Sequence, residues 1–288
     1  MTWEETIKMI REKDEYRELV EKAYFDEDLE LNVVRFGKSA EFDETLAIIK
    51  KYQPKGKTLL DIGSGNGISA VNFSLKGFDV TTVEPDPSET VGAGAIRSLK
   101  NKLQLSSLQV YEALAEDIKF PDAHFDIVYI RQAMHHANDL TKFMNEAVRV
   151  LKPKGLLLTI RDHVVFNETD KQWFLENHPL HKYYGGENAF SPDEYKKAIE
   201  SAGAKIKEEL RHYDSVINYF PTSKKDLENL KEVYLKSVKN SFKKKIGILA
   251  SFPFIFTLYR SVKGIDGSKA NNELQVPGRM YSYISIKS

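Results

Sequence analysis

The sequence contains no cysteine, which excludes disulfide bridges, thiolate zinc sites and cysteine nucleophiles. It also lacks net charge, because 42 lysine and arginine residues balance 42 aspartate and glutamate residues. A neutral chain has no general attraction to nucleic acid or to an anionic membrane, so we expect no nucleic-acid partner. With 41% hydrophobic residues among 288, the chain is expected to fold as one large domain or two small ones.

Long apolar runs are missing as well. The longest one, residues 246–258, is shorter than the roughly 20 residues that cross a bilayer, and Pro253 interrupts it. Residues 1–5 show no basic region followed by an apolar stretch, so no secretory signal is visible. These absences predict a soluble, cytoplasmic protein.

Short apolar segments alternate with helix-length segments from residue 57 to residue 162. This alternation is typical of a parallel sheet with crossover helices. Residues 205–213 form a candidate sixth strand, after a helix that begins at Ser191 and ends at Gly203. The other predicted strands are 58–62, 79–84, 108–112, 125–130, 156–161 and 281–286, and the predicted helices are 2–24, 41–52, 68–75, 89–103 and 140–151, with a connector over 26–37.

A glycine-rich turn follows the first predicted strand, in the segment Leu59-Leu60-Asp61-Ile62-Gly63-Ser64-Gly65-Asn66-Gly67-Ile68. Glycines at this point let the backbone turn tightly and approach a ligand, and the next helix offers free N–H groups. The dinucleotide fingerprint would need a glycine at Ile68. Pyrophosphate binding is therefore disfavoured, although an NAD-dependent oxidoreductase on a similar fold stays an alternative.

Acidic residues stand at the ends of the next two strands. Glu84 follows Asp61 by 23 residues, close to the spacing at which a carboxylate accepts hydrogen bonds from ribose hydroxyls. The segment Glu116-Asp117-Ile118 ends the third strand region, where a carboxylate could accept from an adenine amino group. Because ligands of open α/β sheets bind at this edge, the acidic strand ends together indicate a nucleoside site.

These motifs resemble a known family. Asp61-x-Gly63-x-Gly65-x-Gly67, Glu84, Glu116-Asp117 and Phe125-Asp126-Ile127-Val128 are similar to the successive motifs of class I S-adenosylmethionine-dependent methyltransferases. The branch similar to ubiquinone- and menaquinone-biosynthesis methyltransferases is the nearest. Its turn before the fifth strand resembles Leu151-Lys152-Pro153-Lys154-Gly155, although Lys154 stands where a second glycine is usual. The match covers about residues 57–162 and, more loosely, 191–213.

The resemblance implies an α/β fold with a Rossmann-like seven-stranded sheet, helices on both faces and an antiparallel last strand. It implies S-adenosylmethionine as cofactor, with the methionine portion at Asp61 and the glycine-rich turn, the ribose at Glu84 and the adenine at Asp117. The implied cofactor residues are Asp61, Gly63, Ser64, Gly65, Gly67, Glu84, Glu116, Asp117, Ile118, Arg131 and Gln132. The expected division is an N-terminal helical segment (1–37), a core (38–220 and 276–288) and a helical insertion or lid (221–275).

Histidines near the ends of the fourth and fifth strands are candidates for proton transfer, because an unperturbed pKa near 6.5 suits a general base. His136 and His163 are the predicted catalytic residues, although a histidine pair at 135–136 could instead cap a helix or pack the pocket wall. The predicted substrate-binding residues are His135, Arg161, Asp162, His181 and Tyr184. The histidines lack metal-ligand spacing, so no metal is expected.

The predicted function is transfer of a methyl group to an oxygen of a small polar or sugar-like acceptor, with an anionic acceptor also considered. The alternatives are a lipid-linked acceptor at a membrane surface, the NAD-dependent oxidoreductase and a non-enzymatic nucleoside binder. Lysines from 224 to 245 precede the apolar run 246–258, and a solvated helix face is favoured there over membrane contact. A monomer or a homodimer is expected.

Overall fold

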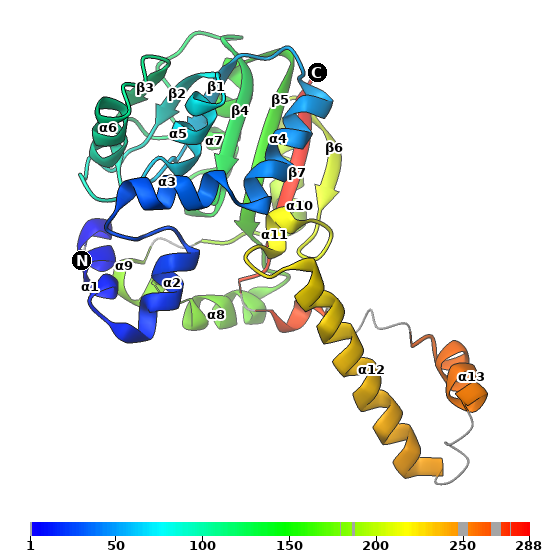
Figure 1. The fold of residues 1–288 in the computed structure, drawn as a ribbon. Coiled ribbons are helices and arrows are strands. Elements are labelled where there is room, and N and C mark those ends of the chain that lie inside the picture. The colour runs from blue at the N-terminus through cyan, green and yellow to red at the C-terminus, as the bar shows by residue number, and fades with distance from the viewer. Residues whose placement is uncertain (1, 179, 186–187, 247–252, 266–271, 277) are drawn as a thin grey trace. The chain divides into compact units, whose positions relative to one another are not determined.

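The computed structural model describes residues 2–178, 180–185, 188–246, 253–265, 272–276 and 278–288 (Figure 1). The chain divides into two compact units. The first unit is Met1–Asn218 together with Pro277–Ser288, and the second is Tyr219–Val276. Within the described residues no helix is both long and apolar enough to span a bilayer.

A seven-stranded sheet forms the centre of the first unit, in the order β3-β2-β1-β4-β5-β7-β6. Strands β1 to β5 pair in parallel, whereas β7 is antiparallel to both of its neighbours. The predicted Rossmann-like fold with an antiparallel last strand is therefore confirmed. The strands are β1 (Thr58–Ile62), β2 (Asp79–Val83), β3 (Leu108–Tyr111), β4 (Phe125–Arg131), β5 (Leu151–His163), β6 (Ala204–Leu210) and β7 (Met280–Lys287).

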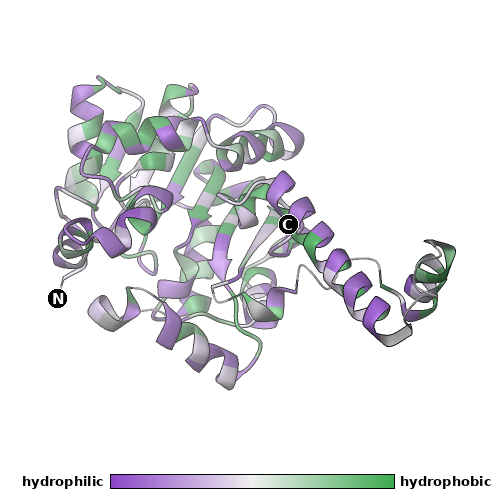
Figure 2. Ribbon diagram, turned by 60° about the horizontal axis from the view of Figure 1, so that its bottom comes forward, coloured by the Kyte–Doolittle hydropathy of each residue, from purple (hydrophilic) through white to green (hydrophobic). Residues whose placement is uncertain are grey.

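Helices cover both faces of this sheet. On one face α7 (Leu140–Val150) and α10 (Pro192–Ser201) bury their apolar sides against the strands. On the other face lie α4 (Ala40–Tyr52) and α5 (Ile68–Leu75), where Phe73 packs at 5.2 Å from Phe42 and 5.0 Å from Tyr129, measured between ring centroids. Hydrophobic residues recur along the strands between these layers (Figure 2), so the core lies on both sides of the sheet.

Further helices flank the sheet and make up the second unit. In the first unit α6 (Ala93–Lys102) packs beside β3, and α8 (Glu168–Asn177) and α9 (His181–Tyr184) follow β5. The remaining helical elements are α1 (Trp3–Arg11), η1 (Asp14–Tyr16), α2 (Arg17–Lys22), α3 (Leu29–Gly37), η2 (Met134–His136), α11 (Val216–Tyr219), α12 (Lys224–Ile246), α13 (Pro253–Lys263) and η5 (Glu273–Gln275).

The N-terminal segment differs from the prediction. A single helix over 2–24 was wrong, because Lys13 adopts an extended conformation that separates α1 from η1 and α2. The connector predicted over 26–37 was also wrong, because it contains α3. There the Asp28 side chain accepts a hydrogen bond from the Leu31 backbone N–H and caps the helix.

The fifth strand is longer than predicted, since β5 begins at Leu151 rather than at residue 156. Lys154 takes a positive φ of 61°, and the β4–β5 register shifts between Phe125 and Ile127. An irregularity of this kind lets a strand continue through residues 151–155, which the sequence predicts as a turn.

A buried ion pair ties α4 to the ends of β4 and β5. Glu41 is completely buried, and its carboxylate accepts from Arg131 Nε at 2.6 Å and Nη2 at 3.1 Å. Arg161 Nη1 lies 3.6 Å from Glu41 Oε2. Burial alone would raise the pKa of Glu41, but the charges of Arg131 and Arg161 lower it below its ordinary value. The burial of Glu41, Arg131 and Arg161 is therefore tolerated only because their opposite charges lie together.

Replacing Glu41→Gln should destabilise the protein by about 3–5 kcal/mol, because two buried guanidinium groups would lose their counter-charge. Urea unfolding followed by circular dichroism measures this change. Glu44→Gln is the matched control, since Glu44 lies on the same helix and is exposed. Equal free energies of unfolding for the two variants would contradict the assigned role of the pair.

Candidate functional site

The glycine-rich turn connects β1 to α5. Gly63, Gly65 and Gly67 have positive φ angles of 71°, 55° and 81°, a region that L-residues with side chains rarely adopt. A Cβ on Gly63 would lie 2.7 Å from the Ala133 Cβ, and one on Gly67 would lie 2.8 Å from Ile96 Cγ1. At Gly65 the nearest atom is the Val91 oxygen at 3.9 Å. Gly63 and Gly67 thus need glycine, whereas the middle residue, Gly65, has space beside it.

Asp61, just before this turn, is a buried carboxylate with one unsatisfied oxygen. Its side chain is 1% exposed, and Oδ2 accepts from the Ser69 hydroxyl at 2.6 Å. Oδ1 is buried and has no hydrogen-bond partner among the described residues. Burial raises the pKa of Asp61 to about 6, against the opposing effect of the Ser69 hydrogen bond. A buried acceptor in this state is suited to a donor from a ligand.

Glu84 follows β2 and turns its carboxylate toward the same turn. Oε2 accepts from the Gly65 backbone N–H at 2.7 Å, and Oε1 accepts from the Asp86 N–H at 3.0 Å. Burial raises the pKa of Glu84 to about 7, and the nearby charge of Asp61 contributes in the same direction. Two acidic groups from neighbouring strands therefore meet at the glycine-rich turn.

A second polar cluster lies where β4 and β5 end. His135 Nδ1 is 3.0 Å from Asp162 Oδ1, and the His135 backbone N–H donates to the same oxygen at 3.2 Å. The side chains are 3% and 0% exposed. Because a carboxylate only accepts, Nδ1 of His135 is the donor in this hydrogen bond.

Three further histidines gather around this pair. The His135 ring centroid is 4.2 Å from that of His136 and 4.9 Å from that of His163, which in turn lies 5.6 Å from His178. His163 Nδ1 donates to the Gly278 carbonyl at 3.2 Å. The part of the chain that the structure describes holds no side-chain group suited to a metal ion. Histidines beside a carboxylate are suited to proton transfer, so the cluster is a candidate for that role.

Comparison with known proteins identifies the core. A family model described as a methyltransferase domain matches residues 60–159. An uncharacterized methyltransferase, YcgJ of Bacillus subtilis, is 33% identical over 112 residues, which cover 36% of this chain and 40% of that protein. The ubiquinone/menaquinone biosynthesis C-methyltransferase UbiE of Escherichia coli is 32% identical over 107 residues, covering 37% and 43%.

The chain carries a class I S-adenosylmethionine-dependent methyltransferase domain. The matches span about two fifths of the first curated relatives' length, so they concern this domain. Solved structures share the fold. A putative sarcosine dimethylglycine methyltransferase from Galdieria sulphuraria has a TM-score of 0.56 at 15% identity, covering 88% of this chain and 85% of that one. The [4+2]-cyclase SpnF has a TM-score of 0.54 at 15% identity, covering 85% and 80%.

The residues of the methyltransferase domain suit S-adenosylmethionine. This cofactor carries an ammonium group, a sulfonium and two ribose hydroxyls. The unsatisfied Oδ1 of Asp61 and the carboxylate of Glu84 offer buried acceptors for such donors and cations. The space at Gly65 lets a ligand approach the backbone. Asp61, Glu84 and the glycine-rich turn are thus the residues that would hold the cofactor, with the Ser64 hydroxyl accepting from Thr82 beneath them.

The predicted adenine residues differ in their exposure and in their partners. Asp117 is 62% exposed and pairs with Lys119. Ile118 is buried in the core, and Glu116 accepts from the Asn138 N–H at 3.1 Å at the entry to α7. The adenine contacts of Glu116, Asp117 and Ile118 stay predictions, and Asp117 is the member of the set that solvent reaches most.

Arg131 and Gln132 of the predicted cofactor set and Arg161 of the predicted substrate set have protein partners. The Arg131 guanidinium is bound to Glu41, and Arg161 Nη1 donates to the Ile217 carbonyl. Gln132 has a positive φ of 51°, and its Nε2 lies 4.0 Å from Met280 Sδ. Both guanidinium groups are therefore engaged by protein groups and are not positioned to bind an anionic acceptor.

Segment 180–184 packs against the N-terminal helices. Tyr184 lies 5.3 Å from Trp3 between ring centroids, and Leu180 is buried with Ile7 of α1. The Nδ1 atom of His181 is buried without a hydrogen-bond partner among the described residues. A substrate contact for His181 and Tyr184 stays a prediction.

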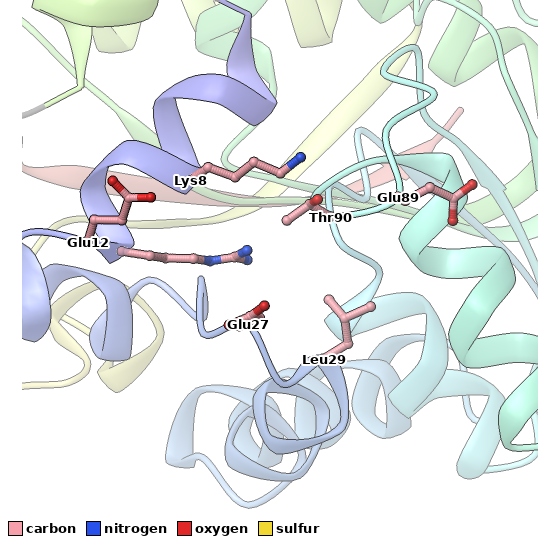
Figure 3. A pocket seen from close by; sticks show the side chains of 7 residues that line it. Lys8, Glu12, Glu27, Leu29, Glu89 and Thr90 are labelled. Carbon is pink, nitrogen blue, oxygen red and sulfur yellow. The ribbon is translucent and has the colours of Figure 1, made fainter.

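A hollow of about 410 Å³ lies between α1, residues 27–29 and the segment before α6. In Figure 3 the Lys8 side chain extends toward Thr90 across it. It is lined by Lys8, Arg11, Glu12, Glu27, Leu29, Glu89 and Thr90. The lining carries both charge signs and does not include Asp61 or Glu84.

Cofactor affinity should increase as the pH rises through about 7, because Glu84 accepts ribose hydrogen bonds best as a carboxylate and its pKa is raised to about 7. Calorimetric titration with S-adenosylhomocysteine should show a gain of up to tenfold between about pH 6 and about pH 8. Over the same interval the folded state loses stability, since a raised carboxyl pKa favours the protonated form.

The control is Glu84→Gln, which should bind at least about tenfold more weakly at pH 8 and lose most of the pH dependence. Glu89→Gln, in the hollow, should behave as the unsubstituted protein. A pH profile that is the same with and without Glu84 would remove this residue from the site.

Proposed function

We propose that the protein transfers a methyl group from S-adenosylmethionine to a hydroxyl oxygen of a small polar acceptor. The methyltransferase domain supports the donor half of this reaction. The observation that carries the acceptor half is the buried hydrogen bond between His135 and Asp162, beside the switch point where β1 and β4 neighbour each other.

The His135–Asp162 pair has the arrangement of a general base and its orienting carboxylate. Asp162 accepts the proton-bearing Nδ1 of His135, so Nε2 is the atom that takes a proton from the acceptor hydroxyl. The carboxylate then stabilises the imidazolium that forms. S-adenosylmethionine supplies an electrophilic methyl group when bound, and the remaining task of the chain is to align acceptor and methyl.

His135 is thus proposed as the base in place of His136 and His163, the two histidines that the sequence favoured. His163 donates its Nδ1 proton to the Gly278 carbonyl and packs against Phe174 at 4.9 Å. The His136 ring packs against that of His135, with 4.2 Å between the centroids and 41° between the ring planes. Both would shape the wall of the acceptor site, and both stay candidates for contacts with the acceptor.

The proposed acceptor is polar and need not be anionic. An arginine clamp on a carboxylate or phosphate is unsupported, because Arg131 and Arg161 are bound within the Glu41 network. Histidine, tyrosine and carboxylate groups around the ends of β4 and β5 suit hydrogen bonds to hydroxyls, as in a sugar-like molecule. The family match favours methyl transfer over the NAD-dependent alternative.

A non-methylating enzyme or binder is the second candidate. The likeness in fold to the [4+2]-cyclase SpnF, at a TM-score of 0.54, favours keeping it, because a fold does not determine a reaction. Incubation with methyl-labelled S-adenosylmethionine and a fractionated metabolite extract distinguishes the two. We expect label in a small hydroxyl-containing product, whereas tight cofactor binding without any transfer would support the second candidate.

Replacing His135→Gln or Asp162→Asn should lower kcat by roughly 10²–10⁴, the contribution typical of general-base catalysis. The affinity for S-adenosylhomocysteine should stay unchanged, because neither residue belongs to the proposed cofactor set. The rates are measured with the acceptor identified in the labelling experiment.

His124→Gln is the matched control and should keep full activity, because His124 is exposed and stands just before β4, at the opposite edge of the sheet. Equal rates for His135→Gln and His124→Gln would exclude His135 as the base.

A further inference from the structure

Positive charge is concentrated in one segment of this otherwise neutral chain. Residues 224–263 contain ten lysine or arginine residues and three acidic ones, a net charge of +7 in a chain whose formal net charge is zero. On α12, the exposed residues Lys236, Lys239 and Lys243 follow one another at spacings of three and four. They therefore share one face of the helix.

Helix α13 presents an apolar stripe to solvent. Phe254, Leu258 and Val262 are 66%, 60% and 75% exposed, and a spacing of four places them along one side of the helix. Single exposed apolar residues are common, but a continuous exposed stripe indicates an interaction surface. Figure 2 shows the contrast between the hydrophilic α12 and the hydrophobic α13.

Aromatic rings form a contact between the two helices. The Phe242 ring of α12 stacks on Tyr259 at 4.3 Å and lies 5.6 Å from Phe256. Lys239 Nζ lies 5.7 Å from the centroid of the Phe256 ring. The basic face of α12 thus adjoins α13, while the stripe of Phe254, Leu258 and Val262 is left exposed.

We propose that the unit Tyr219–Val276 binds the surface of an anionic phospholipid bilayer. The stripe of α13 would enter the boundary between headgroups and acyl chains, and the lysines of α12 would pair with lipid phosphates. With 11 residues, α13 is too short to cross the bilayer and suits a position parallel to its surface. This surface goes beyond the proposed methyl transfer and does not depend on it.

The charge and the stripe together favour a bilayer over other occupants. A second copy of this unit would place a segment of net charge +7 against another of the same sign, which repels. An RNA would pair with the lysines but would leave Leu258 and Val262 in water. An anionic bilayer satisfies both features with one surface.

Sedimentation of the full chain with lipid vesicles tests the proposal. Vesicles of phosphatidylcholine mixed with phosphatidylglycerol should bind the protein, and binding should weaken as salt is added. Vesicles of phosphatidylcholine alone should bind it at least about tenfold more weakly, because about seven net charges lose their attraction to the surface. No binding to the anionic vesicles, or equal binding to both kinds, would overturn the proposal.

Two variants separate the contribution of the α13 stripe to vesicle binding from that of the α12 lysines. Leu258→Glu combined with Val262→Glu should reduce vesicle binding at least about tenfold, since the stripe would become charged. A triple lysine variant should reduce vesicle binding roughly fivefold or more per residue. Its changes are Lys236→Glu, Lys239→Glu and Lys243→Glu.

Matched controls carry the same changes outside the unit. Leu75→Glu alters an apolar residue that is 54% exposed on α5, and a triple lysine variant alters exposed positions of the first unit. Both should bind vesicles as the unsubstituted protein does. The control lysine variant is Lys50→Glu, Lys55→Glu and Lys197→Glu.

Other outcomes would identify a different occupant. Vesicle binding that the unit variants leave unchanged would overturn the proposal. A dimer in light scattering that Leu258→Glu with Val262→Glu dissociates, without vesicle binding, would assign the stripe to a second copy. Binding of a labelled RNA that only the unit's lysine variant abolishes, again without vesicle binding, would assign the lysines to nucleic acid. Circular dichroism confirms that each variant is folded.

Discussion

Asp61 and Glu84 are held almost completely out of water at the ends of two neighbouring parallel strands, and this burial constrains the whole cofactor edge. An ionised carboxylate in such a place is unfavourable unless hydrogen bonds or a cation compensate it. The protein provides part of that compensation through the Ser69 hydroxyl and the Gly65 N–H. Among the described residues it leaves Asp61 Oδ1 without a hydrogen-bond partner, and the pKa values of both carboxyl groups stay raised. A cationic ligand with hydroxyl donors would supply the hydrogen bonds and the positive charge that these two carboxylates lack.

The N-terminal helices hold the neighbouring edge in place by a different interaction. Glu41 of α4 joins Arg131 and Arg161 at the ends of β4 and β5, and Asn66 of the glycine-rich turn donates to the Tyr24 carbonyl at 2.7 Å. Residues remote in sequence thus fix both the cofactor edge and the histidine cluster. Because Glu41 engages both arginines, the proposed acceptor site is left with the histidine cluster and the buried Asp162 carboxylate, which suit the proton removal proposed above.

Sequence patterns predicted the parts of the molecule that depend on local periodicity. The positions of the parallel strands, the glycine-rich turn and the acidic end of β2 follow from apolar runs and from residues with special backbone freedom. The antiparallel last strand was predicted from the family resemblance, and the strand order comes from the structure. The Asp162–His135 hydrogen bond could not be predicted in this way. It depends on a register shift between Thr159 and Asp162 and on a positive φ of 61° at Arg161, and strand alternation carries no signal of either. Likewise, nothing in the segment Glu116-Asp117-Ile118 indicates that Asp117 faces solvent beside Lys119.

A crystal structure of the full chain with S-adenosylhomocysteine would show whether Asp61 and Glu84 hold the cofactor. We expect the ribose hydroxyls to donate to the Glu84 carboxylate, the amino-acid portion to lie along Gly63–Gly67 and a ligand donor to reach Asp61 Oδ1. A nucleoside in the hollow between α1 and Thr90, with no ligand donor at Asp61 Oδ1, would show that these carboxylates do not hold the cofactor.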